Sequence, residues 1–302
     1  MIELVSKGMQ DLISDYMKKE FIKMPHKSFS IQLEIGLFVA TSSMVPQILK
    51  KDLNKSELAR QKLAPIIARL LGYDPEAGHN IESVFTMFWR LARKADDMMD
   101  YSDSSDKKWL EVLQHVFLLC SKAENLPKVI PAERWLSTIS HFFYLMSKTC
   151  EGEIDDLLFR RPSLSNYEKM VLQKTGPWFT GRITCTALAV GMHHNQLVTD
   201  LQDFGNFVSL AYQIRNDIQD IETEQKDIVI GKLNYPSILL MSQRPLPSVG
   251  CGAKIPLHLY YNHRIIEFAN RTAQTYEENA KRIALKYSHE LEQLTIDLCS
   301  SG

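Results

Sequence analysis

The chain has 302 residues, of which 45% are hydrophobic and 24% are charged, enough for a substantial core. Its formal net charge of -1 gives no indication of the strongly basic character of a nucleic-acid-binding protein. The longest apolar stretch, residues 31–49, is interrupted by Gln32, Glu34 and Pro46 and predicts a buried helix, not a transmembrane segment. The five cysteines form no Cys-x-x-Cys pair and are typical of reduced residues, so we expect a cytoplasmic protein.

Helical periodicity extends through almost the whole chain, and no segment shows the strict apolar–polar alternation of a β-strand. Within residues 164–194, Pro177 predicts a kink just after Lys174, Thr175 and Gly176, because proline cannot donate a helical hydrogen bond. No change of composition marks a domain boundary, so we expect one all-α domain spanning residues 1–302. The predicted helices lie at about residues 2–20, 29–50, 55–73, 80–101, 107–123, 131–159, 164–194, 199–224, 233–243 and 256–298.

Aspartates recur at one-turn helical spacing in two segments that are far apart in the chain. Asp96, Asp97 and Asp100 lie in the first segment, and Asp217 and Asp220 lie in the second. Such side chains project from one helix face, and carboxylates in apolar segments are costly to bury without a partner. Two groups facing one cavity would bind Mg²⁺ together with substrate phosphates. A single group would more simply be a solvated helix end, and the presence of the second group disfavours that alternative.

Three residues at one-turn steps before Asp96 share its helix face, namely Ala92, Trp89 and Phe85. Acidic residues beside a small residue and then aromatic rings are typical of a charged entrance to an apolar tunnel. The alternative for Phe85 and Trp89 is ordinary packing in the core.

Polar and basic residues accompany the second aspartate group. Gln213 lies one turn before Asp217 and forms a polar stripe with it. Lys174 and Lys232 lie on either side of this helix in the sequence. Taken singly, each lysine would be a solvated surface residue, but near Mg²⁺ and a polyphosphate their charges would complete the neutralisation of the anion.

The order of these motifs resembles that of the trans-isoprenyl diphosphate synthase (polyprenyl synthetase) superfamily, over about residues 62–236. An isolated Asp-Asp-x-x-Asp would be weak evidence, whereas an ordered set of motifs is specific. Within the motifs, Glu153 stands where the family has glutamine, and Asn216 stands where it has aspartate. The matching segments are residues 96–100, residues 152–156 for the family's Gly-Gln-x-x-Asp, Lys174-Thr175, residues 212–220, and residues 227–232 with Pro236.

This resemblance implies an isoprenoid synthase-type bundle of antiparallel helices around a deep apolar central cavity, usually as a homodimer. It also implies three Mg²⁺ ions that bridge the carboxylates to the diphosphate of an allylic prenyl diphosphate. Asp96, Asp100 and Asp217 would ligate the metal directly, and Asp220 would bind through metal-bound water, with Asp97 in a similar supporting role. The residues implied in catalysis are Asp96, Asp97, Asp100, Lys174, Asp217 and Lys232. Those implied in substrate binding are Lys174, Thr175, Gln213, Lys232, Ala92, Trp89 and Phe88.

The sequence departs from the family where a second substrate, isopentenyl diphosphate, would bind. Gln61 and Ala64 stand where the family has basic residues, although Lys62 is retained. Residues 104–106 are Ser-Ser-Asp where the family has paired arginines. Each lost charge-assisted contact is worth roughly 1.5–3 kcal/mol, so we predict poor binding of isopentenyl diphosphate.

We therefore expect a Mg²⁺-dependent prenyltransferase that ionises an allylic diphosphate and uses isopentenyl diphosphate or another acceptor. In the family, a bulky residue at the position of Ala92 limits product length. Ala92 is small, so the floor of the tunnel is expected about 5 Å deeper, at Phe88 or Trp89. A C15 or C20 substrate is therefore expected. Terpene synthase-like cyclisation and prenylation of a non-diphosphate acceptor, such as a tryptophan of a signalling peptide, are alternatives. A non-catalytic subunit of a heteromeric synthase is a further alternative, which the retained aspartates disfavour.

Overall fold

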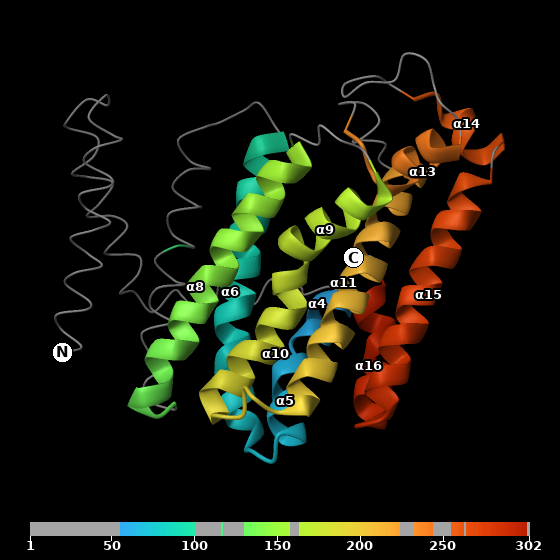
Figure 1. Ribbon diagram of the computed structural model, residues 1–302. Coiled ribbons are helices and arrows are strands. Elements are labelled where there is room, and N and C mark those ends of the chain that lie inside the picture. The colour runs from blue at the N-terminus through green and yellow to red at the C-terminus, as the bar shows by residue number, and fades with distance from the viewer. Residues whose placement is uncertain are drawn as a thin grey trace, which may run out of the picture. The chain divides into compact units, whose positions relative to one another are not determined.

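The computed structural model describes residues 55–100, 116, 130–157, 163–223, 232–243, 255–262 and 264–300, without the side chains of residues 55–57, 93–100 and 157. Within these residues every regular element is an α-helix (Figure 1), which confirms the all-α fold class. The helices predicted at residues 2–20, 29–50 and 107–123 lie outside the described residues, apart from residue 116. None of the described helices combines the length and the hydropathy that crossing a membrane requires.

The chain divides into two compact units. One comprises residues 1–51 and 91–118, and the other comprises residues 52–90 and 119–302. Helix α6 (Pro75–Asp100) belongs to the larger unit as far as Arg90. The expectation of one domain across residues 1–302 stays a prediction.

Two short helices precede α6 in the chain. They are α4 (Lys55–Arg60) and α5 (Leu63–Leu70), so the predicted helix at residues 55–73 is interrupted at residues 61 and 62. A carboxylate oxygen of Asp74 accepts a hydrogen bond from the Glu76 N–H at 2.8 Å and caps the first turn of α6. A Cβ at Gly78 would lie 2.4 Å from the Ala64 carbonyl oxygen, so only glycine permits this close approach of α6 to α5.

Three helices form the middle of the described chain, namely α8 (Ala132–Leu157), α9 (Leu164–Lys174) and α10 (Gly176–Val190). The side chain of Ser163 caps α9 by accepting a hydrogen bond from the Asn166 N–H at 3.1 Å. The predicted segment 164–194 breaks at Thr175, close to the kink that Pro177 predicts. Pro177 lies in the first turn of α10, where its missing N–H removes no helical hydrogen bond.

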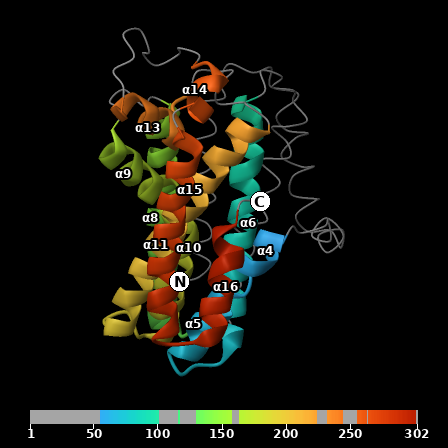
Figure 2. The ribbon, with the colours of Figure 1, turned by 90° about the vertical axis from the view of Figure 1, so that its right-hand side faces the viewer.

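Helix α11 (Gln196–Glu222) packs against both α10 and α15 (Ile265–Leu285), and α15 packs against α16 (His289–Cys299) (Figure 2). The predicted helix at residues 256–298 is wrong in its length, because this segment forms three helices. Arg264 adopts a left-handed φ of 55° between α14 and α15, and the side chain of Ser288 caps α16. Arg264 gives no signal of the first break in the sequence, whereas Ser288 is a residue type that commonly begins a helix, a weak signal of the second break. The last described helices are α11 (Gln196–Glu222), α13 (Tyr235–Gln243), α14 (Leu257–Asn262), α15 (Ile265–Leu285) and α16 (His289–Cys299).

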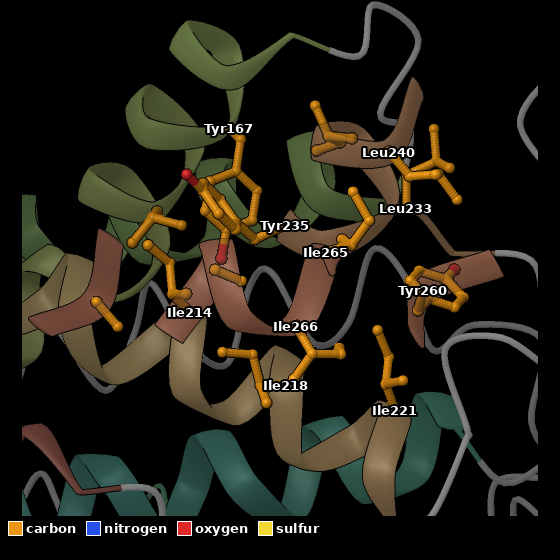
Figure 3. Packing of buried hydrophobic residues seen from close by; sticks show 14 of the residues in the cluster. Tyr167, Ile214, Ile218, Ile221, Leu233, Tyr235, Leu240, Tyr260, Ile265 and Ile266 are labelled. Carbon is orange, nitrogen blue, oxygen red and sulfur yellow. The ribbon is translucent and has the colours of Figure 1, made fainter. Parts of the chain in front are cut away.

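A buried hydrophobic cluster joins α9, α11, α13, α14 and α15 (Figure 3). Ile214, Ile218 and Ile221 occupy one face of α11 at helical spacing and contribute to this cluster. Burying each such side chain is worth about 1.5–3 kcal/mol. Tyr167 of α9 and Tyr235 of α13 meet edge to face within it, with ring centroids 5.2 Å apart. The cluster therefore fixes α9 and α13 against α11, the helix that carries the second aspartate group.

Candidate functional site

Asp217 lies at the centre of a buried hydrogen-bond network on α11, where it is only 5% exposed. Tyr167 Oη donates to its Oδ2 at 2.7 Å, and the Tyr235 N–H donates to the same oxygen at 2.8 Å. Gln213 Nε2 donates to Oδ1 at 2.9 Å. Burial raises the pKa of the Asp217 carboxyl, and the three hydrogen bonds oppose this rise because they favour the charged form. Three hydrogen-bond donors therefore fix the position of the Asp217 carboxylate.

The side-chain amide of Gln213 extends this network to the junction of α9 and α10. Its Oε1 accepts a hydrogen bond from Thr175 Oγ1 at 2.9 Å, while its Nε2 donates to Asp217. These two contacts fix the orientation of the amide, because oxygen and nitrogen each have a matched partner. Thr175, Gln213 and Asp217, which the sequence assigns to one site, therefore come together in the structure.

Lys174 and Lys232 converge on a single carboxylate oxygen. Lys174 Nζ lies 2.7 Å from Asp156 Oδ2, and Lys232 Nζ lies 2.8 Å from the same atom. Burial would raise the pKa of the Asp156 carboxyl, but the two ammonium groups hold it below its ordinary value. The charge of Asp156 also contributes to raising the pKa of Asp217, so the lysine pair adjoins the Asp217 network. Two ammonium groups and one carboxylate therefore lie together. This combination suits a ligand that consists of an anion and a metal ion.

Lys174 has a second acidic partner on α8. Glu153 Oε2 lies 2.7 Å from its Nζ, in addition to the contact with Asp156. Burial lowers the pKa of the Lys174 ammonium, but the two carboxylates raise it overall above its ordinary value. A Cβ at Gly152 would lie 2.4 Å from the backbone nitrogen of Lys174. Gly152 therefore lets α8 approach α9 closely enough for both carboxylates to reach the lysine.

The aromatic residues that were expected to line a tunnel lie in a packed stack with α10. Phe88 stacks on Trp178 with ring centroids 4.4 Å apart, and Trp89 meets Trp178 edge to face at 4.7 Å. Phe85 is 1% exposed and contacts Phe142 edge to face at 5.3 Å. Such contacts are worth about 0.5–1.5 kcal/mol beyond the area that they bury. Phe85 is a core residue, and the tunnel roles of Phe88 and Trp89 stay predictions.

The first aspartate group lies at the C-terminal end of α6, in the smaller unit. The side chains of Asp96, Asp97 and Asp100 lie outside the described residues. Ala92 is half-buried in the same unit. The roles assigned to these four residues from the sequence therefore stay predictions.

The second aspartate group fits Mg²⁺ in its chemistry, because hard cations prefer carboxylate oxygens. Asp217 already accepts three hydrogen bonds, so about one of its roughly four lone-pair positions remains for a metal ion or a metal-bound water. Asp220 is half-buried one turn further along α11. Among the residues with described side chains, no three candidate ligands cluster as a metal site. The other expected ligands, Asp96 and Asp100, lie outside that set.

Two features of this region carry no motif in the sequence. Tyr167 gives Asp217 its shortest hydrogen bond, and only the need of a buried carboxylate for donors could have indicated such a residue. Arg182 of α10 and Glu82 of α6 form a buried ion pair, in which Arg182 Nε donates to Glu82 Oε2 at 2.8 Å. The guanidinium also lies 5.1 Å from the ring centroid of Phe85, so the pair joins α6 to α10 beside the aromatic stack.

The fold defined by these helices is that of isoprenyl diphosphate synthases. A geranylgeranyl pyrophosphate synthetase from the archaeon Geoglobus acetivorans matches with a TM-score of 0.71 and 20% identity, covering 99% of this chain and 98% of that one. The corresponding enzyme from Pyrococcus horikoshii Ot3 matches with a TM-score of 0.66 and 18% identity, over 99% and 98% of the two chains. A polyprenyl synthase from Caulobacter crescentus CB15, solved with calcium and isoprenyl diphosphate, has a TM-score of 0.67 and 17% identity, over 91% and 96%.

The sequence itself identifies the family. Residues 44–244 match the family model described as polyprenyl synthetase, which spans the lysine pair and both aspartate groups. The chain belongs to the polyprenyl synthetase family, and this membership supports a prenyltransferase-type function. A search of curated protein sequences finds no match to the chain.

Proposed function

We propose that this chain is a Mg²⁺-dependent prenyltransferase that ionises a C15 or C20 allylic prenyl diphosphate and transfers the prenyl group. The observation that supports this proposal most is the convergence of Lys174 and Lys232 on one oxygen of Asp156, beside the network around Asp217. Two ammonium groups at one point suit a ligand with several negative oxygens, such as a diphosphate. A solvated lysine on a helix surface has no such neighbour.

The described residues have distinct roles in this reaction. Lys174 and Lys232 bind the diphosphate and stabilise the negative charge that develops on it as the carbon–oxygen bond breaks. Thr175 and Gln213, already linked at 2.9 Å, orient the leaving group or the cation. When bound by Asp96, Asp100, Asp217 and Asp220, Mg²⁺ supplies further positive charge to the departing pyrophosphate.

Aromatic side chains serve a different purpose after ionisation. The allylic fragment is a delocalised cation that water would quench. Phe88 and Trp89 are expected to contribute to an apolar wall that excludes water until the acceptor attacks.

A homodimer is also expected, and light scattering of the purified protein would test this expectation directly.

The residues of α4 and α5 favour second candidate functions that do not use isopentenyl diphosphate as the acceptor. Ala64, where the family has a basic residue, is completely buried on α5. Arg60 is also buried, with its guanidinium 4.3 Å from the ring centroid of Trp89 and 5.4 Å from that of Tyr212. This part of the chain therefore offers fewer accessible cations to a second diphosphate. Prenylation of a non-diphosphate acceptor and terpene synthase-like cyclisation are the second candidate functions.

The test is pyrophosphate release from C10, C15 and C20 allylic diphosphates with Mg²⁺, in the presence and absence of isopentenyl diphosphate. Products are identified by mass spectrometry, and Asp96→Ala is the inactive control. Release that produces a hydrocarbon or an alcohol without isopentenyl diphosphate would support terpene synthase-like cyclisation. A product five carbons longer, formed only with isopentenyl diphosphate, would identify chain elongation and refute the inference from Gln61 and Ala64. An absence of release under every condition would count against the proposed reaction.

A further inference from the structure

Glu153 contacts a lysine that already has a counter-ion. Lys174 Nζ has Asp156 Oδ2 at 2.7 Å and Glu153 Oε2 at the same distance. An ammonium group has three N–H donors, so one is left for any other ligand of Lys174. The side chain of Asp156 is 6% exposed, whereas that of Glu153 is 28% exposed and reaches the lysine from nearer the solvent.

The position of Lys174 does not depend on Glu153. Asp156 contacts both Lys174 and Lys232, and the backbone of Lys174 is fixed by its close packing against Gly152. Without Glu153, the two lysines and Asp156 would carry a net charge of about +1, taking ordinary protonation states. With Glu153 this group of four side chains is neutral. The extra carboxylate therefore changes the charge that the site offers and leaves its geometry to other residues.

We infer that Glu153 weakens the binding of diphosphate at this site, an inference that rests on the proposed function of the Lys174 and Lys232 pair. A diphosphate that approaches Lys174 meets an ammonium group already shared with two carboxylates. It must also tolerate the nearby negative charge of Glu153. The site thus binds diphosphate less tightly than its two lysines alone would allow, and it depends more on Mg²⁺ for neutralisation.

This effect applies equally to the diphosphate of the substrate and to the pyrophosphate product. Because the diphosphate gains negative charge as it leaves, the transition state should be affected at least as strongly as the bound substrate, so both KM and kcat/KM respond to Glu153. Glu153 is therefore expected to raise the KM for the allylic diphosphate and to weaken product inhibition by pyrophosphate. Faster release of pyrophosphate is the functional consequence.

The experiment is isothermal titration of the full-length protein with pyrophosphate at fixed Mg²⁺, comparing the wild type with Glu153→Gln. Glutamine keeps the size of the side chain and an oxygen that can accept from Lys174, so only the charge is removed. The difference between a charge-assisted and a neutral hydrogen bond predicts roughly tenfold tighter binding of pyrophosphate. The KM for the allylic diphosphate should fall by a similar factor.

Glu151→Gln is the matched control, because Glu151 lies on the same helix but pairs with Lys148 at 2.6 Å. Pyrophosphate affinity should be the same in this variant as in the wild type. Unchanged or weaker binding in Glu153→Gln would overturn the inference, since a residue that merely positions Lys174 gives that result. Lys174→Gln tests the proposed function separately, because loss of pyrophosphate binding is expected there whatever Glu153 does. If the wild type and Glu153→Gln both fail to bind pyrophosphate, the proposed function fails and the inference fails with it.

Discussion

Replacing Glu82 with glutamine should destabilise the protein by about 3–5 kcal/mol, the usual cost of removing one partner of a buried ion pair. Glu82 is 4% exposed and Arg182 is 2% exposed. Arg182 Nε donates to both carboxylate oxygens, at 3.0 and 2.8 Å, and Nη2 donates to Oε1 at 2.9 Å. Glutamine preserves the shape of the side chain but leaves the guanidinium buried without a counter-ion. Arginine cannot lose its proton to relieve that cost.

The assay is equilibrium unfolding in urea, with the midpoint and the slope measured for each variant. Glu290→Gln is the matched control, because the ion pair between Arg69 and Glu290 has side chains that are 48% and 55% exposed. An exposed pair of this kind contributes about 0.5 kcal/mol or less. A double variant, Glu82→Met with Arg182→Met, should recover most of the lost stability because it removes both buried charges. A loss below about 1 kcal/mol for Glu82→Gln, or one equal to that of Glu290→Gln, would refute the reasoning.

Three further predictions concern the candidate site. Asp156→Asn should cost about 2 kcal/mol at pH 7, because Lys174 and Lys232 lose their shared carboxylate. Since the pKa of Asp156 is lowered in the folded protein, this cost should begin to shrink below about pH 4, where the carboxyl of the unfolded chain takes up its proton, and should vanish only below the lower pKa of the folded state; unfolding curves at pH 3 and pH 7 would show a smaller cost at pH 3. Gly152→Ala should destabilise by about 1–3 kcal/mol and weaken pyrophosphate binding, because its Cβ would force α8 away from Lys174; unchanged calorimetric titrations would contradict this. Ala92→Phe should shorten the preferred allylic substrate, as measured by turnover of C10, C15 and C20 diphosphates, and unchanged selectivity would remove Ala92 from the tunnel.

Much of the fold could be predicted from local sequence. Helical periodicity identified every long described helix, and Pro177 indicated the break between α9 and α10, because both signals depend on the backbone within one or two turns. The segment at residues 256–298 was predicted as one helix, since Arg264 has no strong propensity to end a helix and Ser288, a favourable helix-capping residue, gives only a weak signal. Boundaries of this kind are decided by packing against α11 and the other neighbouring helices.

The sequence by itself determined which residue types are present and in which order, and this was sufficient to associate Lys174, Lys232 and Asp217 with one kind of chemistry. Only the tertiary structure decided how these charges are balanced. Asp217 is held by Tyr167, and Lys174 is shared between Asp156 and Glu153. The physical reason is that local propensity acts over a few residues. Hydrogen bonds and ion pairs between helices depend instead on distances that exist only after the chain has packed.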